Sequence, residues 1–141
     1  MILLITGSRQ LTAKQTAVLM AQGLEALRQQ GHPAPTLLLH GGAAGADVYA
    51  EAWAQAAGLP TEIVPPDYTR YGSKAAPLVR NTRLVARADA TLALYAPGRW
   101  RRGGTWDAAQ KTAAAGKPLL EVEAGSERQH YTPAPVLLLS T

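Results

Sequence analysis

LLLHGGAAGADVYAEAWAQAAG, residues 37–58, sets an apolar run directly against a cluster of glycines and alanines that leads into a helical pattern. The apolar run has the length of a buried strand, and the segment after the glycines has the length and composition of a helix. Two interpretations of the junction are open. The glycines serve a tight turn with close packing of helix on strand, or they let the backbone approach a ligand.

The same alternation of strand and helix runs through the chain. Short apolar runs predict strands at residues 2–5, 36–40, 61–64, 90–95 and 118–122. A capping box of Thr12 and Gln15 introduces the first helix, and further helices are predicted at residues 45–57, 77–88 and 105–115. Apolar strands separated by single helices imply right-handed crossovers. We therefore predict an α/β fold, a doubly wound Rossmann-like parallel sheet of about five strands with helices on both faces.

The chain of 141 residues is long enough for one compact domain with a core. We predict a single domain over residues 1–141, with its core over 1–122 and a tail over 123–141. The tail reads as a loop until VLLLS (136–140), an apolar segment suited to an extra strand at a sheet edge or at a subunit contact. A homo-oligomer is expected.

Composition excludes several classes of site. The chain has no cysteine, and His32, His40 and His130 are far apart in the sequence, so no metal site is expected. No apolar stretch reaches the length that spans a bilayer, and no signal-peptide pattern opens the chain. A cytoplasmic protein without a membrane partner is therefore expected.

Positive charge is concentrated in one segment. Between Arg70 and Lys117 there are ten basic and two acidic residues, a net charge of +8, whereas the remainder of the chain carries −4. This asymmetry indicates an anionic partner, either a phosphorylated small molecule or nucleic acid. A solvated basic surface without such a partner is the alternative.

Glycine clusters follow two of the predicted strands, at the edge where doubly wound sheets bind ligands. The glycines of residues 41–45 would let backbone N–H groups at a helix start surround a phosphate, and Gly103-Gly104-Thr105 opens a second helix in the same way. Neither cluster has the Lys-Ser/Thr pair of a Walker A loop or the GxGxxG of the dinucleotide fingerprint. We therefore expect a phosphate site of another kind.

Four motifs together resemble the YspA-like branch of the SLOG superfamily: ITGSR (5–9), LLHGGAAGAD (38–47), PPDYTRYGSKAAPLVRN (65–81) and PGRWRRGGTWD (97–107). The resemblance covers most of residues 1–120, with the motifs in the correct order. The superfamily includes the Lonely Guy phosphoribohydrolases and the DNA-processing protein DprA, and many members act in bacterial and phage systems. The resemblance implies a Rossmann-like domain that binds a nucleotide or nucleotide-derived ligand, in a superfamily with many members proposed as sensors or processing enzymes. For this chain we expect a sensor or carrier, and no particular cofactor is predicted.

The resemblance also implies which residues bind the ligand. By position these are Gly7, Ser8, Arg9, Gly41, Gly42, Gly45, Asp47, Asp67, Arg80, Asn81, Gly103, Gly104, Thr105 and Asp107. Arg80 is suited to a two-pronged contact with phosphate, and Thr105 can donate its hydroxyl at the helix start. Tyr68 and Tyr71 are candidates for stacking on a base or, alternatively, for packing the long loop that contains them.

Asp107 and Asp67 are the candidates for a catalytic carboxylate, and no residue is assigned that role. The phosphoribohydrolases have a glutamate in the pattern PGGxGTxxE, where this chain has Ala108, and Asp107 precedes it by one position. One position rotates a helical side chain by about 100°, so the same hydrolytic chemistry is not expected. The alternatives are a nucleoside-phosphate N-glycosidic or phosphoribosyl hydrolase that uses Asp107, and a DprA-like nucleic-acid-binding protein. Residues 99–102 (RWRR) read as a mobile solvated flap, with closure over a ligand as the alternative.

Overall fold

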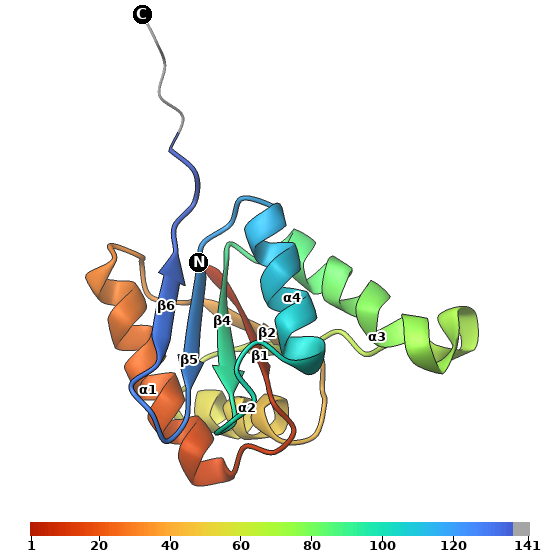
Figure 1. Cartoon of the computed structure of the whole chain (residues 1–141), viewed down its shortest axis with the longest axis horizontal. Helices are drawn as coiled ribbons and strands as arrows, with labels where there is room; N and C mark the ends of the chain where they lie inside the picture. The colour runs from red at the N-terminus through yellow and green to blue at the C-terminus, as the bar shows by residue number, and fades with distance from the viewer. Residues whose placement is uncertain (137–141) are drawn as a thin grey trace, which may run out of the picture.

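The computed structural model describes residues 1–136, which form one six-stranded sheet covered by helices on both faces (Figure 1). The strands are β1 (Ile2–Gly7), β2 (Leu37–His40), β3 (Thr61–Ile63), β4 (Ala90–Tyr95), β5 (Leu119–Glu123) and β6 (Gln129–Thr132). The helices are α1 (Ala13–Gln29), α2 (Ala46–Ala56), α3 (Tyr68–Arg87) and α4 (Gly103–Ala114). The predicted Rossmann-like α/β fold is confirmed.

The strand order is β3-β2-β1-β4-β5-β6, and β1 to β5 are parallel. The chain builds outward from β1 to β3 on one side and then returns to place β4 and β5 on the other. The loops after β1 and β4 therefore leave the sheet toward opposite faces, which opens a crevice at the carboxyl ends of these two strands.

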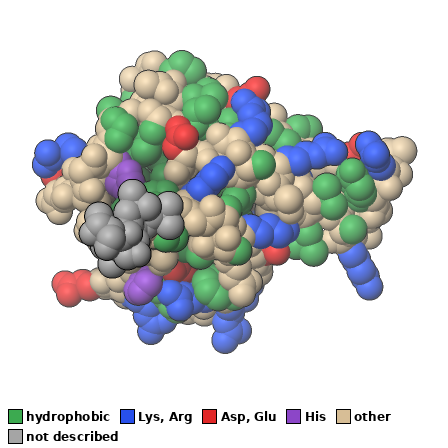
Figure 2. Space-filling model, turned by 90° about the horizontal axis from the view of Figure 1, so that it is seen from above, with side chains coloured by type: hydrophobic (Ala, Val, Ile, Leu, Met, Phe, Trp, Pro, Cys, Tyr) green, Lys and Arg blue, Asp and Glu red, His purple; other side chains and the backbone are tan. Residues whose placement is uncertain are grey.

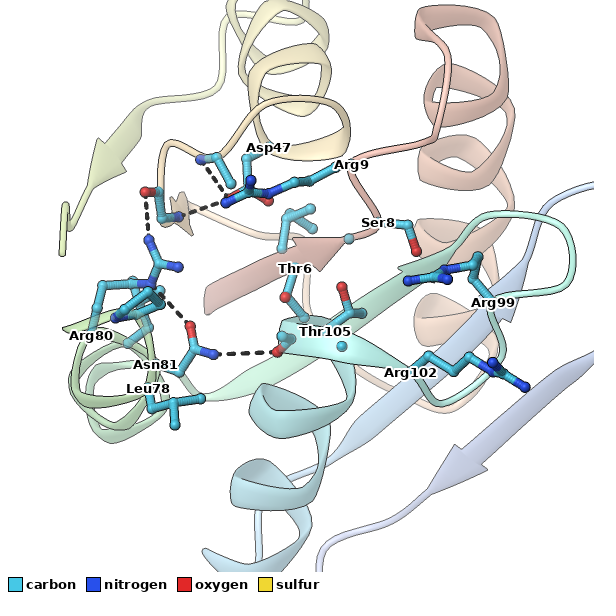
Figure 3. Close-up of a pocket in the computed structure, with 18 of the residues that line it drawn as sticks. Thr6, Ser8, Arg9, Asp47, Leu78, Arg80, Asn81, Arg99, Arg102 and Thr105 are labelled. Carbon is cyan, nitrogen blue, oxygen red and sulfur yellow. Dashed lines mark hydrogen bonds between the residues drawn. The ribbon is translucent and has the colours of Figure 1, made fainter. Parts of the chain in front are cut away.

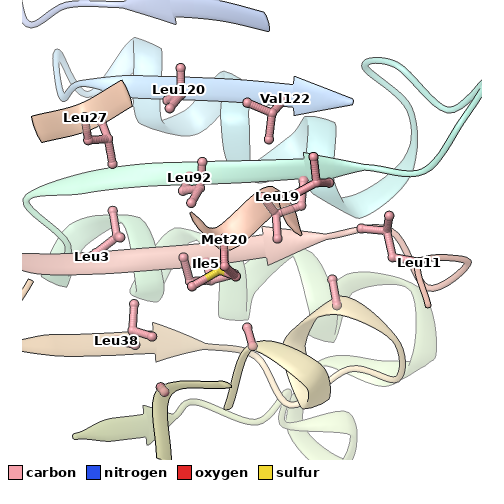
Figure 4. Packing of buried hydrophobic residues seen from close by; sticks show 14 of the residues in the cluster. Leu3, Ile5, Leu11, Leu19, Met20, Leu27, Leu38, Leu92, Leu120 and Val122 are labelled. Atoms are coloured by element: carbon pink, nitrogen blue, oxygen red, sulfur yellow. The ribbon is translucent and has the colours of Figure 1, made fainter. Parts of the chain in front are cut away.

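Alternate residues of the central strands pack against different helices, as their apolar pattern predicts. Leu3 and Ile5 of β1 contact a core built with α1 and α2, which includes Leu19 and Met20 (Figure 4). On the opposite face Leu4 packs with α3, and residues of β4 pack with α4. The predicted capping box starts α1, with reciprocal bonds between Thr12 and Gln15.

Two boundaries predicted from the sequence were wrong. The segment 65–77 is not a long loop, because α3 begins at Tyr68 once the Asp67 side chain caps it by accepting a hydrogen bond from the Arg70 N–H. A kink at Gly72, with φ of 79°, lets this first turn join the rest of α3. Likewise, α4 begins at Gly103, two residues before the predicted start.

The sixth strand also differs from the prediction. β6 lies at residues 129–132 and pairs with β5 in antiparallel register, so the segment expected to be a loop forms the sheet edge. Tyr131 of β6 packs on the core, and its hydroxyl lies 2.7 Å from His32 Nε2. The other prediction, a strand at VLLLS (136–140), concerns residues that the structure does not describe, apart from Val136. Within residues 1–136, no helix combines the length and the hydropathy needed to cross a membrane.

Candidate functional site

A cavity of about 370 Å³ lies at the carboxyl ends of β1 and β4, in the crevice where the strand order reverses (Figure 3). Its walls come from the loops after β1, β2 and β4, from α3 and from the first turn of α4. The residues that line it are Ile5, Thr6, Gly7, Ser8, Arg9, Gln10, Gly41, Ala43, Asp47, Pro77, Leu78, Arg80, Asn81, Leu84, Arg99, Arg102, Gly103, Gly104 and Thr105. This is the position at which sheets of this kind bind ligands.

The structure brings together most of the predicted ligand-binding residues. Those that line the cavity are Gly7, Ser8, Arg9, Gly41, Asp47, Arg80, Asn81, Gly103, Gly104 and Thr105. Those that do not line it are Gly42, Gly45, Asp67 and Asp107. The predicted set therefore divides into ten residues that line the cavity and four that lie outside its lining.

Positive charge dominates the cavity wall. Four arginines line it, from the β1 loop, α3 and the β4 loop: Arg9, Arg80, Arg99 and Arg102. Within residues 1–136, none of the four forms an ion pair with a carboxylate. One carboxylate, that of Asp47, lies in the same wall. The cavity is therefore suited to an anion.

Arg80 is the most constrained of these arginines. Its Nη1 donates to Gly41 O at 2.7 Å, and its Nε donates to Asn81 Oδ1 at 3.0 Å, so both acceptors are neutral (Figure 3). Burial lowers the pKa of the Arg80 guanidinium, whereas the nearby carboxyl of Asp47 acts in the opposite direction. A guanidinium that is partly desolvated and forms no direct ion pair gains more from a bound anion than an exposed one does.

The first turn of α4 adds backbone donors to the cavity. Its N-cap residue, Arg102, has extended backbone angles, and no side chain caps the turn. The first N–H groups of a helix have no intrahelical partners, and the helix dipole favours negative charge there. A Cβ at Gly104 would meet no atom within 4 Å, which leaves this end of the helix open to the cavity.

The glycine loop after β2 is organised differently from a phosphate cradle. Asp47 Oδ2 accepts hydrogen bonds from the N–H groups of Gly41 and Ala43, each at 3.2 Å, and the Gly42 N–H donates to His40 Nδ1 at 3.0 Å. Three N–H groups of the loop therefore already have protein acceptors. Burial raises the pKa of the Asp47 carboxyl, whereas the hydrogen bonds from the Gly41 and Ala43 N–H groups lower it.

Close packing explains two other glycines of the predicted set. A Cβ at Gly7 would collide with Ala46 Cβ, so the residue allows α2 to approach β1. Gly45 has a φ of 83°, and a Cβ there would lie 2.5 Å from Arg9 O. Ser8 joins the two strands that flank the crevice, because its Oγ accepts the Ala96 N–H at 3.1 Å.

Both predicted carboxylate candidates have structural partners. Asp67 is the exposed N-cap of α3, as described above. Asp107 Oδ2 accepts hydrogen bonds from Asn81 Nδ2 at 3.0 Å and from Lys111 Nζ at 2.9 Å, between α3 and α4. Tyr68 and Tyr71 likewise do not line the cavity, and the Tyr71 ring lies beneath two guanidinium groups, those of Arg70 and Arg83.

Some cavity residues were missed by sequence reasoning or interpreted differently. Arg99 and Arg102 were predicted in a solvated flap, with closure over a ligand as the alternative, and both line the cavity. Trp100 and Arg101 of the same segment pack against the sheet. Leu78 and its neighbour Pro77 give the cavity an apolar side. The arginines were recognisable by their charge beside a helix start, but no sequence signal distinguished Leu78 from an ordinary surface leucine.

Comparison with protein-family models gives a match over the first half of the chain. The family model described as YspA, cpYpsA-related SLOG family matches residues 1–71, half of the chain. The matched region contains the first two loops of the cavity, and Arg80 and the start of α4 lie beyond it. No curated protein and no solved structure matches the chain.

Proposed function

The chain belongs to the YspA, cpYpsA-related SLOG family, and from this premise we propose that it binds a nucleotide or nucleotide-derived ligand through its phosphate. The observation that carries the proposal is the set of four cavity arginines without a carboxylate partner in the described chain. Like charges that line one cavity favour an anionic ligand, which offsets their charge.

The phosphate is assigned to the space between the first turn of α4 and the arginines. The unpartnered N–H groups at Gly103 and Gly104 donate to it, and Arg102 lies at the same helix end. Arg80 lies on α3, across the cavity from this helix end (Figure 3), and would contact the phosphate from that side. Charge-assisted hydrogen bonds from guanidinium to phosphate are among the strongest polar contacts in proteins.

The uncharged part of the ligand is assigned to the apolar side of the cavity. Pro77 and Leu78 line this side, and the Leu78 side chain is exposed within it. A base or a ribose placed there buries apolar surface that is otherwise open to water. The same molecule then contacts an apolar wall and a cationic wall, which is the pattern expected for a nucleotide site.

Binding without hydrolysis is the role we propose. Neither Asp107 nor Asp67 lines the cavity, and Asp47, the carboxylate that does, accepts two backbone hydrogen bonds. A general acid or a nucleophile must reach the reacting atoms of the substrate. The positions of these carboxylates therefore favour a sensor or carrier over a hydrolase.

The basic segment 70–117 is divided in space, which favours a small ligand over nucleic acid. Some of its cations line the cavity, and others pair with carboxylates: Arg87 with Glu62, Arg101 with Glu121 and Lys111 with Asp107. On the face at the amino ends of the parallel strands, Lys and Arg side chains are scattered among neutral ones (Figure 2). A nucleic-acid surface concentrates them in a patch or stripe.

Titration calorimetry with inorganic pyrophosphate, AMP, ADP, ADP-ribose and a single-stranded oligonucleotide tests the proposal. We expect a nucleotide to bind, and we expect Arg80→Gln to weaken it by about 1.5–3 kcal/mol, the value of one hydrogen bond to a charged group. Arg83→Gln is the matched control, because Arg83 is exposed on the same helix and does not line the cavity. Leu78→Ala should weaken the nucleotides more than pyrophosphate.

Two results would contradict the proposal. In one, no member of the panel binds the intact protein. In the other, the oligonucleotide alone binds, with a strong dependence on salt and with equal losses in Arg80→Gln and Arg83→Gln, which is the behaviour of a nucleic-acid surface.

A further inference from the structure

The loop between β4 and α4 presents its arginines to two different sides. It begins with a turn in which the Arg99 N–H donates to Ala96 O at 2.9 Å across Pro97 and Gly98, whose φ is 75°. Arg99 and Arg102 line the cavity, where Figure 3 shows both side chains. Arg101 lies between them in sequence but is directed away, toward β5. The loop therefore separates two cavity arginines by one that is bound to the sheet.

Arg101 has an unfavourable backbone conformation. Its φ is 56°, and it is the one non-glycine residue with positive φ in the part of the chain that the structure describes. A side chain with a Cβ rarely occupies this region, and it stays there only when surrounding contacts compensate for the strain. The contacts of the Arg101 side chain therefore determine whether the loop holds this shape.

The main contact of Arg101 is a buried carboxylate. Glu121, on β5, has a side chain that is 1% exposed. Its Oε1 accepts Arg101 Nη2 at 3.0 Å, its Oε2 accepts Arg101 Nε at 3.2 Å, and Tyr95 Oη donates to Oε2 at 2.8 Å. His130 of β6 is farther away, at 3.8 Å from Oε1. The two-pronged pair fixes both the position and the plane of the Arg101 guanidinium.

Aromatic rings hold the same guanidinium from its sides. The Arg101 Cζ lies 5.4 Å from the centre of the Trp100 ring and 5.0 Å from that of Trp106. Trp100 also packs on Tyr95, with ring centres 5.1 Å apart. Arg128 stacks on the Trp100 ring as well, at 5.3 Å, but none of its hydrogen bonds goes to Glu121. Arg128 therefore shares the ring contact of Arg101 without the ion pair.

We propose that the Arg101–Glu121 pair is a positioning device for the ligand site. It anchors the β4–α4 loop to the sheet, so that Arg99 and the open first turn of α4 already face the cavity before a ligand arrives, with Arg102 at the edge of the cavity. Arg101 does not touch the ligand. This inference rests on the proposed function, because it assigns the pair to the phosphate end of that site, and preorganisation of this kind increases affinity by reducing the ordering cost of binding.

The test separates positioning from stability. Arg101→Ala alone leaves a buried carboxylate without its cation, which destabilises the fold. In Arg101→Ala/Glu121→Gln the neutral amide removes that unpaired charge, so melting should recover toward the wild-type value while the loop stays unanchored. The Arg99 amide, whose N–H donates to Ala96 O within this loop, should then exchange its hydrogen faster by about tenfold or more. Pyrophosphate affinity should be about tenfold weaker, similar to the smaller losses that follow mutation of the outer-shell partners of metal ligands. Arg128→Ala is the matched control and should change neither readout.

The exchange readout needs no ligand, so it distinguishes the two proposals. If the wild-type protein binds no probe while the Arg99 amide exchanges faster in the double variant, the proposed function fails and the anchoring role stands. If the double variant is folded and its Arg99 amide exchanges at the same rate as in the wild type, the inference is overturned. Wild-type pyrophosphate affinity in that variant would also overturn it, because an unanchored loop would then hold its arginines equally well.

Discussion

The guanidinium of Arg80 occupies the space that a side chain at Gly41 would fill. Nη1 donates to Gly41 O at 2.7 Å across 39 residues of sequence, and a Cβ at Gly41 would collide with the same nitrogen. The contact continues through Asn81, which accepts from Arg80 Nε and donates to Asp107. Gly41 thus admits an arginine, and a chain of hydrogen bonds orients that arginine toward the cavity.

Gly41→Ala should therefore weaken nucleotide binding by displacing Arg80. The φ of Gly41 is outside the positive range, so alanine fits the backbone there and its effect falls on the guanidinium. We expect a loss of affinity similar to that of Arg80→Gln, measured by calorimetry on variants that melt cooperatively. Residues in direct contact are not additive, so Gly41→Ala should cost nothing further in an Arg80→Gln background. Two full and additive losses would contradict this coupling.

Gly104→Ala should separate ligand contact from fold stability. A Cβ at this position meets no atom within 4 Å, and alanine in a helix is favoured over glycine by up to about 1 kcal/mol. The melting temperature should stay the same or rise. Pyrophosphate affinity should fall, because the added methyl lies where the anion approaches the first turn of α4. Unchanged affinity in this variant would place the phosphate elsewhere in the cavity.

Asp47 should give the stability of the protein a specific dependence on pH. Burial raises the pKa of its carboxyl in the folded state above the unfolded value. The stabilising contribution of such a group is complete below the unfolded pKa and is lost as the pH rises through the folded pKa. Asp47→Asn is neutral at every pH and keeps an oxygen for the Gly41 and Ala43 N–H groups.

The free energy of unfolding of Asp47→Asn, relative to that of the wild type, should therefore increase as the pH rises from the unfolded pKa of Asp47 to its folded value. Because one proton is involved, the ratio of the two unfolding equilibrium constants can change by at most about tenfold for each pH unit. Urea unfolding of both proteins at several pH values measures it. A difference that decreases with pH would show that the two backbone hydrogen bonds lower the pKa by more than burial raises it.

Sequence periodicity predicted the fold because the parallel strands are apolar on both faces, a pattern that few other architectures share. It failed where the decisive signal was weak. QHYT (129–132) is too polar to suggest a strand, yet β6 forms because β5 offers an unpaired edge. PPDYTRYGSKAAP (65–77) was predicted as a long loop, although Gly72 only bends α3 and Pro77 lies near the start of the segment after the bend.

The candidate site could be predicted as a place but not as a set of contacts. Loops at one edge of the sheet had to meet, whatever their side chains. The separate roles of the clustered glycines depended on tertiary contacts. Gly41 accommodates Arg80, Gly45 accommodates the backbone of Arg9, and Gly42, with φ of 71°, has Ile63 as the nearest neighbour of its missing Cβ. No local pattern contains those distant partners.

Two substitutions of Asp107 distinguish a positioning role for this residue from a catalytic one. Its Oδ2 accepts from Asn81 and Lys111 outside the cavity lining, and Asn81 in turn orients Arg80. Asp107→Asn retains an oxygen for the Asn81 amide, so nucleotide affinity should stay close to that of the wild type. Asp107→Ala removes the acceptor and frees Asn81, so affinity should fall, by less than in Arg80→Gln because the guanidinium itself remains.

Calorimetry with the tightest-binding nucleotide measures both variants, and chromatography of overnight incubations with AMP measures release of the base. A catalytic carboxylate cannot be replaced by an amide, because the amide neither ionises nor attacks. Base release by the wild type that is abolished in Asp107→Asn, in a variant that still binds AMP, would therefore establish the hydrolase alternative. Equal behaviour of the wild type and Asp107→Asn, with weaker binding in Asp107→Ala, is the result expected if Asp107 acts through Asn81 and Arg80.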